Sequence, residues 1–496
     1  MEEGRPKNWL KISCVGCIGL PISVVLLTFG LPISVVLLTF GALKCQVNQI
    51  GDQLPKELAA LKKMGVPTEP ADLAPNPPMP DSENAKFLLQ EIIADQQALK
   101  ERKDYQACLS AFPELQGSPP ESNPKIVEGI SLISSTLRKL DGISKYQRVD
   151  FQRDANLGAD LLFPETAPLK ELAKWQAARS RLLVKQGRFK ESLVALRSIF
   201  VSARLLATDP YMLSALVGMS IDTIGHAALA NHLEAIQENE PALTEAAAML
   251  DSLPPTIDAK RSLSGEFVLG RVSTQKIRSL VTMYGGCYPD EDGNYNDSVY
   301  ISEQNPMDRL TFGDPAVRRM FEAKFMQAWR KAYARMPESD TDWKGIMTAM
   351  NSVSETIDDD ESVVNQLNRL LFPFYGEALK SMGMFQARHH LSLLAIRILQ
   401  DRPKGLPTDL AKYGDLAIDP MNGKPIRYDR KGNGFKIWSV GKDEVDNHGT
   451  KYYPYTGMRN QNVDEVLLFS YPEKAPPLTK HTTTTPSAAT GFALGR

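Results

Sequence analysis

The chain has 496 residues, of which 43% are hydrophobic and 23% are charged, and its 57 lysine and arginine residues nearly balance its 59 aspartate and glutamate residues. At roughly 150 residues per domain, this length implies more than one structural unit. A net charge of −2 gives no electrostatic basis for a nucleic-acid partner. The ordinary composition excludes collagen, coiled-coil rods, disulfide scaffolds and fully disordered chains.

A long stretch without charge lies near the N-terminus. Residues 12–43 are flanked by Lys11 and Lys44, and the unit LPISVVLLTFG occurs at 20–30 and again at 31–41. With one copy removed, the stretch has the length of a helix that crosses a bilayer core of about 30 Å. We predict one transmembrane helix at 12–43 that carries a tandem duplication. The stretch is too short for two spans and too long for the apolar core of a cleaved signal peptide.

Basic residues before this stretch set its expected orientation. Arg5, Lys7 and Lys11 precede it, whereas few basic residues follow closely. Positive charge is retained on the cytoplasmic side of a span. The sequence therefore predicts a cytoplasmic tail at 1–11 and an extracytoplasmic bulk, with the lipid bilayer as the first partner.

The five cysteines fall into two groups. Cys14 and Cys17 lie within the apolar stretch and are expected to be small apolar residues of the span, because a zinc site needs four ligands and no second pair exists. Cys45, Cys108 and Cys287 lie outside it. One disulfide is possible among these three, but the sequence does not select the pair.

A juxtamembrane helix and a proline-rich linker are expected at 44–82. Residues 54–64 predict a short helix that ends at Gly65. The segment VPTEPADLAPNPPMP at 66–80 is typical of a semi-rigid linker in the polyproline II conformation.

Residues 83–383 are expected to form a helical domain. The strongest pattern lies at 168–235, where apolar residues recur at helical spacing in three segments and Gly187 separates the first two. The string LLVKQGRFKESLVALRSIF resembles a tetratricopeptide-type repeat, but it does not recur at a period of about 34 residues, so we predict a helical-hairpin domain instead of a solenoid. Further helices are expected at 85–103, 126–140, 239–251, 314–335, 340–357, 361–382 and 384–400.

The pattern changes at the C-terminal end. A turn with proline and glycine at 419–425 precedes short alternating segments that predict antiparallel strands at 426–428, 435–439 and 463–469. An oxygen-rich loop lies at 441–447. These features predict a small α+β module at 384–473, and the threonine-rich remainder, 474–496, predicts a disordered tail.

The segment DPMNGKPIRYDRKGNGFKIWSVGKDEVDN at 419–447 resembles the C-terminal module of the major pseudopilin of type II secretion systems. In that family, this region holds a structural calcium ion. The resemblance implies that Asp443 and Asp446 are carboxylate ligands and that Ser439 or Asn447, with loop carbonyls, completes the shell. Oxygen ligands on a flexible loop suit Ca²⁺. The alternative is an acidic turn whose carboxylates face water.

The chain departs from that family elsewhere. It has no prepilin cleavage site, and some 350 residues separate the span from the module. The layout from PTEPADLAPNPPMPDSENA to the C-terminal module also resembles uncharacterised single-pass membrane proteins of the planctomycete type. That resemblance implies a bacterial inner membrane but no activity.

Three functions remain open at this point. The sequence contains no Gly-x-Ser-x-Gly, His-Glu-x-x-His, Walker or dinucleotide-binding motif. We therefore expect a scaffold or interaction protein with a protein partner on the helical domain or the module. The alternatives are an assembly factor of a type II secretion or pilus-like system, and a carboxylate-dependent hydrolase between the helical domain and the β module.

Overall fold

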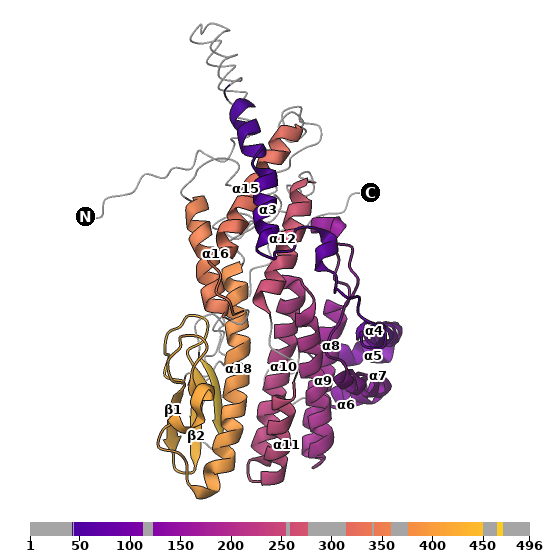
Figure 1. Cartoon of the computed structure of the whole chain (residues 1–496). Coiled ribbons are helices and arrows are strands. Elements are labelled where there is room, and N and C mark those ends of the chain that lie inside the picture. The colour runs from indigo at the N-terminus through magenta and orange to yellow at the C-terminus, as the bar shows by residue number, and fades with distance from the viewer. Residues whose placement is uncertain are drawn as a thin grey trace, which may run out of the picture.

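The computed structural model describes residues 42, 44–112, 123–253, 258–275, 314–339, 342–358, 375–449 and 464–469. The predicted span at 12–43, apart from Ala42, and the predicted tail at 474–496 lie outside these residues. Within them, the protein is mostly helical with one small antiparallel sheet, as predicted (Figure 1).

Three long helices in sequence form the centre of the body. They are α8 (Thr166–Lys185), α9 (Phe189–Thr208) and α10 (Met212–Ile236). Gly187 separates the first two with φ of +74°, and the amide of Arg188 donates to the carbonyl of Leu183 at 2.9 Å. This left-handed glycine closes the end of α8. The predicted helix, tight turn and helix are therefore confirmed.

Shorter helices pack on one side of α8. They surround Trp175, whose ring lies 5.8 Å from Tyr105 and 4.5 Å from Phe112 between centroids. Gly129 is needed there, because a Cβ would lie 2.2 Å from the Trp175 ring. The helices are α4 (Lys86–Lys100), α5 (Lys103–Leu109), α6 (Pro124–Leu132) and α7 (Ser134–Asp141), so the helix predicted at 126–140 is in fact two helices.

A second group of helices forms an aromatic core at the other end of the body. Phe267, Phe325, Trp329, Tyr333 and Tyr375 pack ring against ring, with Phe267 and Trp329 centroids 5.4 Å apart. We call these five residues the aromatic core. The helices involved are α12 (Ala259–Gln275), α15 (Pro315–Tyr333), α16 (Trp343–Asp358) and α18 (Tyr375–Asp401), and α11 (Glu240–Asp251) lies at the opposite end of α18.

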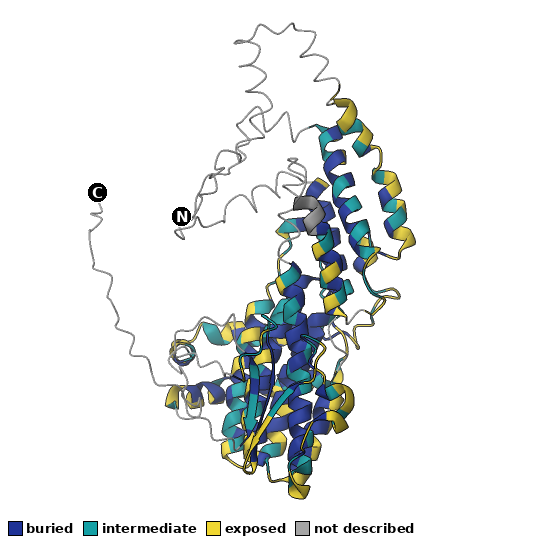
Figure 2. Cartoon of the chain, turned by 90° about the vertical axis from the view of Figure 1, so that its left-hand side faces the viewer, coloured by how far each residue is buried: buried dark blue, intermediate teal, exposed yellow. Residues whose placement is uncertain are grey.

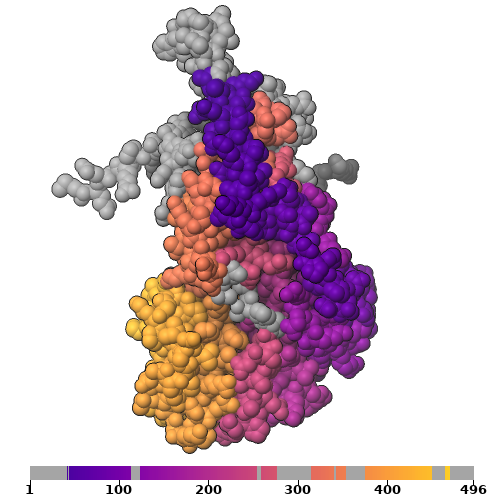
Figure 3. All heavy atoms as spheres, viewed as in Figure 1, coloured from indigo at the N-terminus to yellow at the C-terminus, as the bar shows by residue number. Residues whose placement is uncertain are grey.

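The segment that follows the predicted span lies against the body (Figures 1 and 3). Helix α3 (Leu54–Lys63) packs on α15, and Arg330 donates to Glu57. Thr68 is fully buried, and Glu69 pairs with Arg271 of α12 at 2.6 Å. The proline-rich stretch thus contains a short 3-10 helix, Pro70–Leu73, docked on the protein.

The sheet has the order β1–β2–β3, with both pairs antiparallel. Tyr428 of β1 (Arg427–Lys431) pairs with Ile437 of β2 (Gly434–Ser439), and Trp438 pairs with Val466 of β3 (Glu465–Phe469). Its buried face lies against α18 (Figure 2). The three predicted strands are confirmed, with bounds that differ by at most three residues.

Helix α18 differs from its prediction. The sequence suggested separate helices at 361–382 and 384–400, whereas one helix runs through Gly383 from Tyr375 to Asp401, across the expected start of the C-terminal module. A Cβ at Gly383 would lie 2.4 Å from the Trp343 ring. This glycine therefore marks a close helix contact and not a helix end.

Two further observations concern the membrane and the cysteines. Among the described residues, α10 is long and apolar enough to cross a membrane, although 61% of its apolar window is buried within the protein, which is also typical of a core helix. Cys45 is exposed and Cys108 is buried, and both are free thiols. Cys287 lies outside the described residues.

Candidate functional site

Charged and polar side chains, all buried except the half-buried His389, meet where α18 lies against α9 and α10. They come from all three helices, and we call them the polar seam: Arg204, Asp222, His226, His389 and Ser392. Asp222 is fully buried, Arg204 is 2% exposed and His226 is 6% exposed. Charged groups are rarely placed so deep unless they are paired, so this cluster stands out from the apolar packing around it.

His226 is the centre of the seam. Its Nδ1 lies 2.8 Å from Ser392 Oγ, and its Nε2 lies 3.3 Å from Asp222 Oδ2. Asp222 and His226 are four residues apart on α10, so they share one helix face. The ring also packs edge-on against Phe200, with centroids 4.8 Å apart.

Several buried polar atoms of the seam lack a hydrogen-bond partner. Oδ1 of Asp222, Nε of Arg204 and Nδ1 of His389 are sealed from solvent without one, and Oδ2 of Asp222 has the contact with His226 Nε2 at 3.3 Å. The guanidinium of Arg204 instead stacks on the Phe385 ring, with its central carbon 4.1 Å from the ring centroid. Unpaired buried groups of this kind lower the stability of a native state.

Electrostatic coupling joins the same groups. Burial alone would raise the pKa of Asp222, but the charges of His226, Arg204 and Arg388 together hold it below its usual range. Burial lowers the pKa of His389 to about 3, and the neighbouring Arg204 charge adds to this effect. The seam thus favours an ionised aspartate and a neutral His389.

Ser392, His226 and Asp222 resemble the order of groups in a serine hydrolase triad, but their setting differs. Ser392 lies inside α18 and is 3% exposed, so its hydroxyl does not face a substrate site. A nucleophilic serine needs an exposed position beside donors that stabilise an oxyanion. The arrangement is a buried structural contact between helices.

Arg388, one residue before His389, ties three elements together. Its Nε donates to Glu465 of β3 at 3.0 Å, and its Nη1 donates to Thr223 of α10 at 3.0 Å. The guanidinium therefore bridges the helical body and the sheet from its position on α18.

The Asp-Pro turn is organised by a buried carboxylate. Asp419 is fully buried and accepts hydrogen bonds from the amide of Met421 (3.0 Å), the hydroxyl of Ser439 (2.8 Å) and the amide of Val440 (3.0 Å). This one side chain thus fixes the turn at 419–425 to the end of β2. The sequence pointed to the turn but not to this role of Asp419.

The four predicted calcium ligands are in different surroundings. Ser439 donates its hydroxyl to Asp419 and is turned away from the loop. Asp446 accepts from the indole of Trp438 at 3.0 Å and from Arg427 at 3.2 Å. Asn447 donates its side-chain amide to Asp443 at 3.5 Å.

A further carboxylate, missed in the sequence, lies beside them. Asp464, just before β3, accepts from the amides of Asn447 (3.2 Å) and Gly449 (2.7 Å). Burial, together with the charges of Asp446 and Asp443, raises its pKa. Because Asp464 is separated from the loop in sequence, the sequence pattern did not indicate that they lie together.

The oxygen atoms of these residues have the chemistry that a hard cation requires, but their present arrangement does not form a binding site. Asp443 and Asp446 each repel Asp464 electrostatically, which a cation would relieve. However, within the described part of the chain no group of three or more acidic, histidine or cysteine side chains is arranged to hold a metal ion. Ser439 would have to leave Asp419 to join one.

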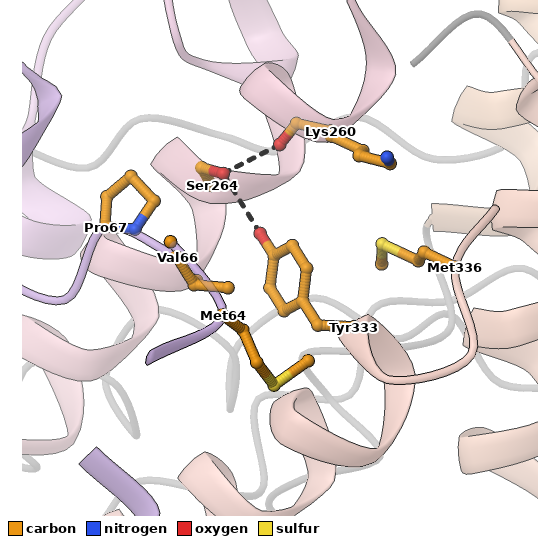
Figure 4. Close-up of a pocket in the computed structure, with 8 residues that line it drawn as sticks. Met64, Val66, Pro67, Lys260, Ser264, Tyr333 and Met336 are labelled. Atoms are coloured by element: carbon orange, nitrogen blue, oxygen red, sulfur yellow. Dashed lines mark hydrogen bonds between the residues drawn. The ribbon is translucent and has the colours of Figure 1, made fainter. Parts of the chain in front are cut away.

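A shallow pocket lies at the far end of the aromatic core, with a volume of about 190 Å³ (Figure 4). Ser264 donates to the carbonyl of Lys260 at 2.8 Å and lies 3.1 Å from the Tyr333 hydroxyl. Burial raises the pKa of Tyr333. Among the described residues that line the pocket none is a carboxylate, so these residues do not supply the paired acids of a glycoside-type hydrolase. Its lining residues are Met64, Gly65, Val66, Pro67, Lys260, Ser264, Tyr333 and Met336.

Comparison of the chain with protein-family models, with curated proteins and with solved structures finds no match in any of the three.

Proposed function

We propose that the protein is a membrane-anchored scaffold or interaction protein that presents its C-terminal module at a fixed position on a helical body. The proposed anchor is the apolar stretch at 12–43, with the N-terminus inside a bacterial inner membrane and the bulk outside. Partners would bind the module or the helical body.

The continuity of α18 is the observation that supports this proposal most. One face of this 27-residue helix packs on α10, α11 and α16, and another packs on β2 and β3. The body and the sheet share a structural element instead of being joined by a loop. A module that is held at a fixed position is useful to a scaffold, because a partner then binds it in one orientation.

Cross-linking in intact cells, followed by purification of the tagged full-length protein from native membranes and mass spectrometry, tests this proposal. Two exposed valines give a matched pair of variants. Val445→Glu alters the loop of the module, where the side chain is 54% exposed, and Val194→Glu alters α9, where it is 45% exposed.

Partners that are captured by the unmodified protein and by Val194→Glu, but lost with Val445→Glu, would place the contact on the module. Recovery of secretion or pilus components would favour the assembly-factor alternative, which rests on the resemblance of residues 419–447. A preparation without any cross-linked partner, for all three proteins, would contradict the scaffold proposal.

We also propose that the loop at 439–447 binds a structural calcium ion through Asp443, Asp446 and loop oxygens. The repulsion of Asp464 by Asp443 and Asp446 supports this proposal. Calcium should raise the melting temperature of the full-length protein in detergent micelles, because an ion that binds only the folded state stabilises it.

Asp443→Ala should abolish that response, whereas Asp429→Ala, at an exposed position of β1, should keep it. Melting curves of the unmodified protein that coincide with calcium and with chelator would refute the calcium site. That result would leave the scaffold proposal standing.

A further inference from the structure

Apart from the imidazoles, the charged side chains around the polar seam balance one another. Arg204 and Arg388 provide two positive charges, and Asp222 and Glu465 provide two negative charges. Arg204 and Asp222 are buried, whereas Arg388 and Glu465 are partly exposed, so an added charge beside the buried pair would be poorly screened. A proton taken up by His389 therefore adds a positive charge next to a largely buried group of charges.

His389 is the imidazole for which that charge is least well compensated. Its Nδ1 is buried without a hydrogen bond, and the charge of Arg204 opposes protonation of the ring more strongly than the charge of Asp222 favours it. His226 is placed differently, because its Nε2 lies 3.3 Å from Asp222 Oδ2. His390, on the next position of α18, places Nδ1 3.2 Å from the carbonyl of Ile418, away from Arg204.

The titratable and charged groups around this part of α18 come from every element packed there. These groups are Arg204 of α9, Asp222 and His226 of α10, Arg388 and His390 of α18, Glu465 of β3, and Asp415 and Asp419 beside His390.

We propose that the seam is a proton-responsive latch, in which protonation of His389 beside Arg204 weakens the docking of α18, and of the strands packed on it, against α9 and α10. The latch is a property of the helix interface and does not depend on the identity of any partner. Closed at neutral pH, it holds the module on the body; in acid, it loosens that contact.

The direction of the effect follows from the pKa of His389. Its ordinary value is about 6.5, and burial in the docked state lowers it to about 3. Because the docked state binds this proton more weakly than the undocked state, the docked state is fully stabilised at pH values above the undocked pKa. This stabilisation is lost as the pH falls toward the docked pKa. Between pH 6.5 and 3, the docking equilibrium constant should fall about tenfold per pH unit.

Hydrogen–deuterium exchange of the full-length protein in detergent micelles, at pH 7.5 and pH 5 with correction for intrinsic exchange rates, tests this proposal. Protection of amides at 385–399 and in β3 should fall about 30-fold at pH 5. Amides of α6 and α7, which do not touch the seam, give the reference within the same molecule.

Variants separate the latch from general acid unfolding. His389→Gln, which cannot be protonated, should keep most of its protection at pH 5. His390→Gln should lose much less of the acid response, because the Ile418 carbonyl and the charges of Asp419 and Asp415 offset part of the effect of burial on the pKa of His390. His389→Lys should show low protection of 385–399 already at pH 7.5, with α6 and α7 unchanged. Equal protection of the unmodified protein at both pH values, or an unchanged acid response in His389→Gln, would overturn the proposal.

Discussion

The aromatic core and the polar seam both hold α18 in place, but they do so by opposite means. At its start, Tyr375 contacts Trp329 at 5.7 Å between ring centroids. In its middle, His389 and Ser392 meet charged residues of α9 and α10 that lack several hydrogen bonds. Packing of apolar rings does not depend on protonation, whereas a buried set of charges is stable only in one charge state. One contact of α18 is therefore independent of protonation, and the other depends on it.

Removal of the largest ring in the aromatic core should have the largest effect. Trp329 is fully buried among four other rings, so Trp329→Ala should lower the free energy of unfolding by about 3–5 kcal/mol. The loss should be equal at pH 7.5 and pH 5, because no titratable side chain is changed. Denaturant unfolding of the full-length protein in micelles at both pH values measures it. Trp329→Phe should lose less, and a loss that grows in acid would contradict the contrast between the two regions.

The contact between α16 and α18 lies between these two regions and offers a matched pair of glycines. Gly383→Ala places a methyl group 2.4 Å from the Trp343 ring and should cost about 1–3 kcal/mol. Gly376→Ala on the same helix meets only Asn351 Oδ1 at 3.7 Å and should stabilise the protein by up to about 1 kcal/mol, through helix propensity. Thermal unfolding compares them. Equal effects would mean that Gly383 does not limit the packing.

The smallest expected effect concerns the bridge to the sheet. Arg388→Gln removes a partly buried pair with Glu465 and should cost about 1 kcal/mol, seen as faster exchange of β3 amides. Arg397→Gln, farther along α18, removes an exposed pair with Asp251 at 3.3 Å and should cost less than about 0.5 kcal/mol. If Arg388→Gln left β3 unchanged, the seam and the apolar face would suffice to hold the sheet.

Periodicity predicted α8 to α11 well because these helices have strong apolar faces and clear ends, such as Gly187. It missed α12, whose sequence AKRSLSGEFVLGRVSTQ contains small residues of low helix propensity. Gly265 shows why they occur there. A Cβ at this position would lie 1.7 Å from the carbonyl oxygen of Pro210. The residues that weaken the helical signal are those that permit close packing.

The candidate site was predictable only in part. The turn at 419–425 and the acidic loop were found from composition, but Asp464 follows the loop at a distance in sequence and was not. The seam depends on contacts between α10 and α18, which lie some 166 residues apart at His226 and Ser392. A local signal did exist: Asp222 and His226 stand four residues apart within a largely apolar part of α10. Its partners could not be read from the sequence.

The docked position of residues 54–73 has a mechanical consequence. Glu57 binds Arg330, Glu69 binds Arg271, and Thr68 is buried. These contacts limit how far the stretch that was expected to be a linker can extend. If residues 12–43 cross a bilayer as proposed, a pull or twist on the protein would be transmitted to α12 and α15 instead of being absorbed by an elastic tether. The height and the tilt of the helical body relative to the membrane would then be restricted.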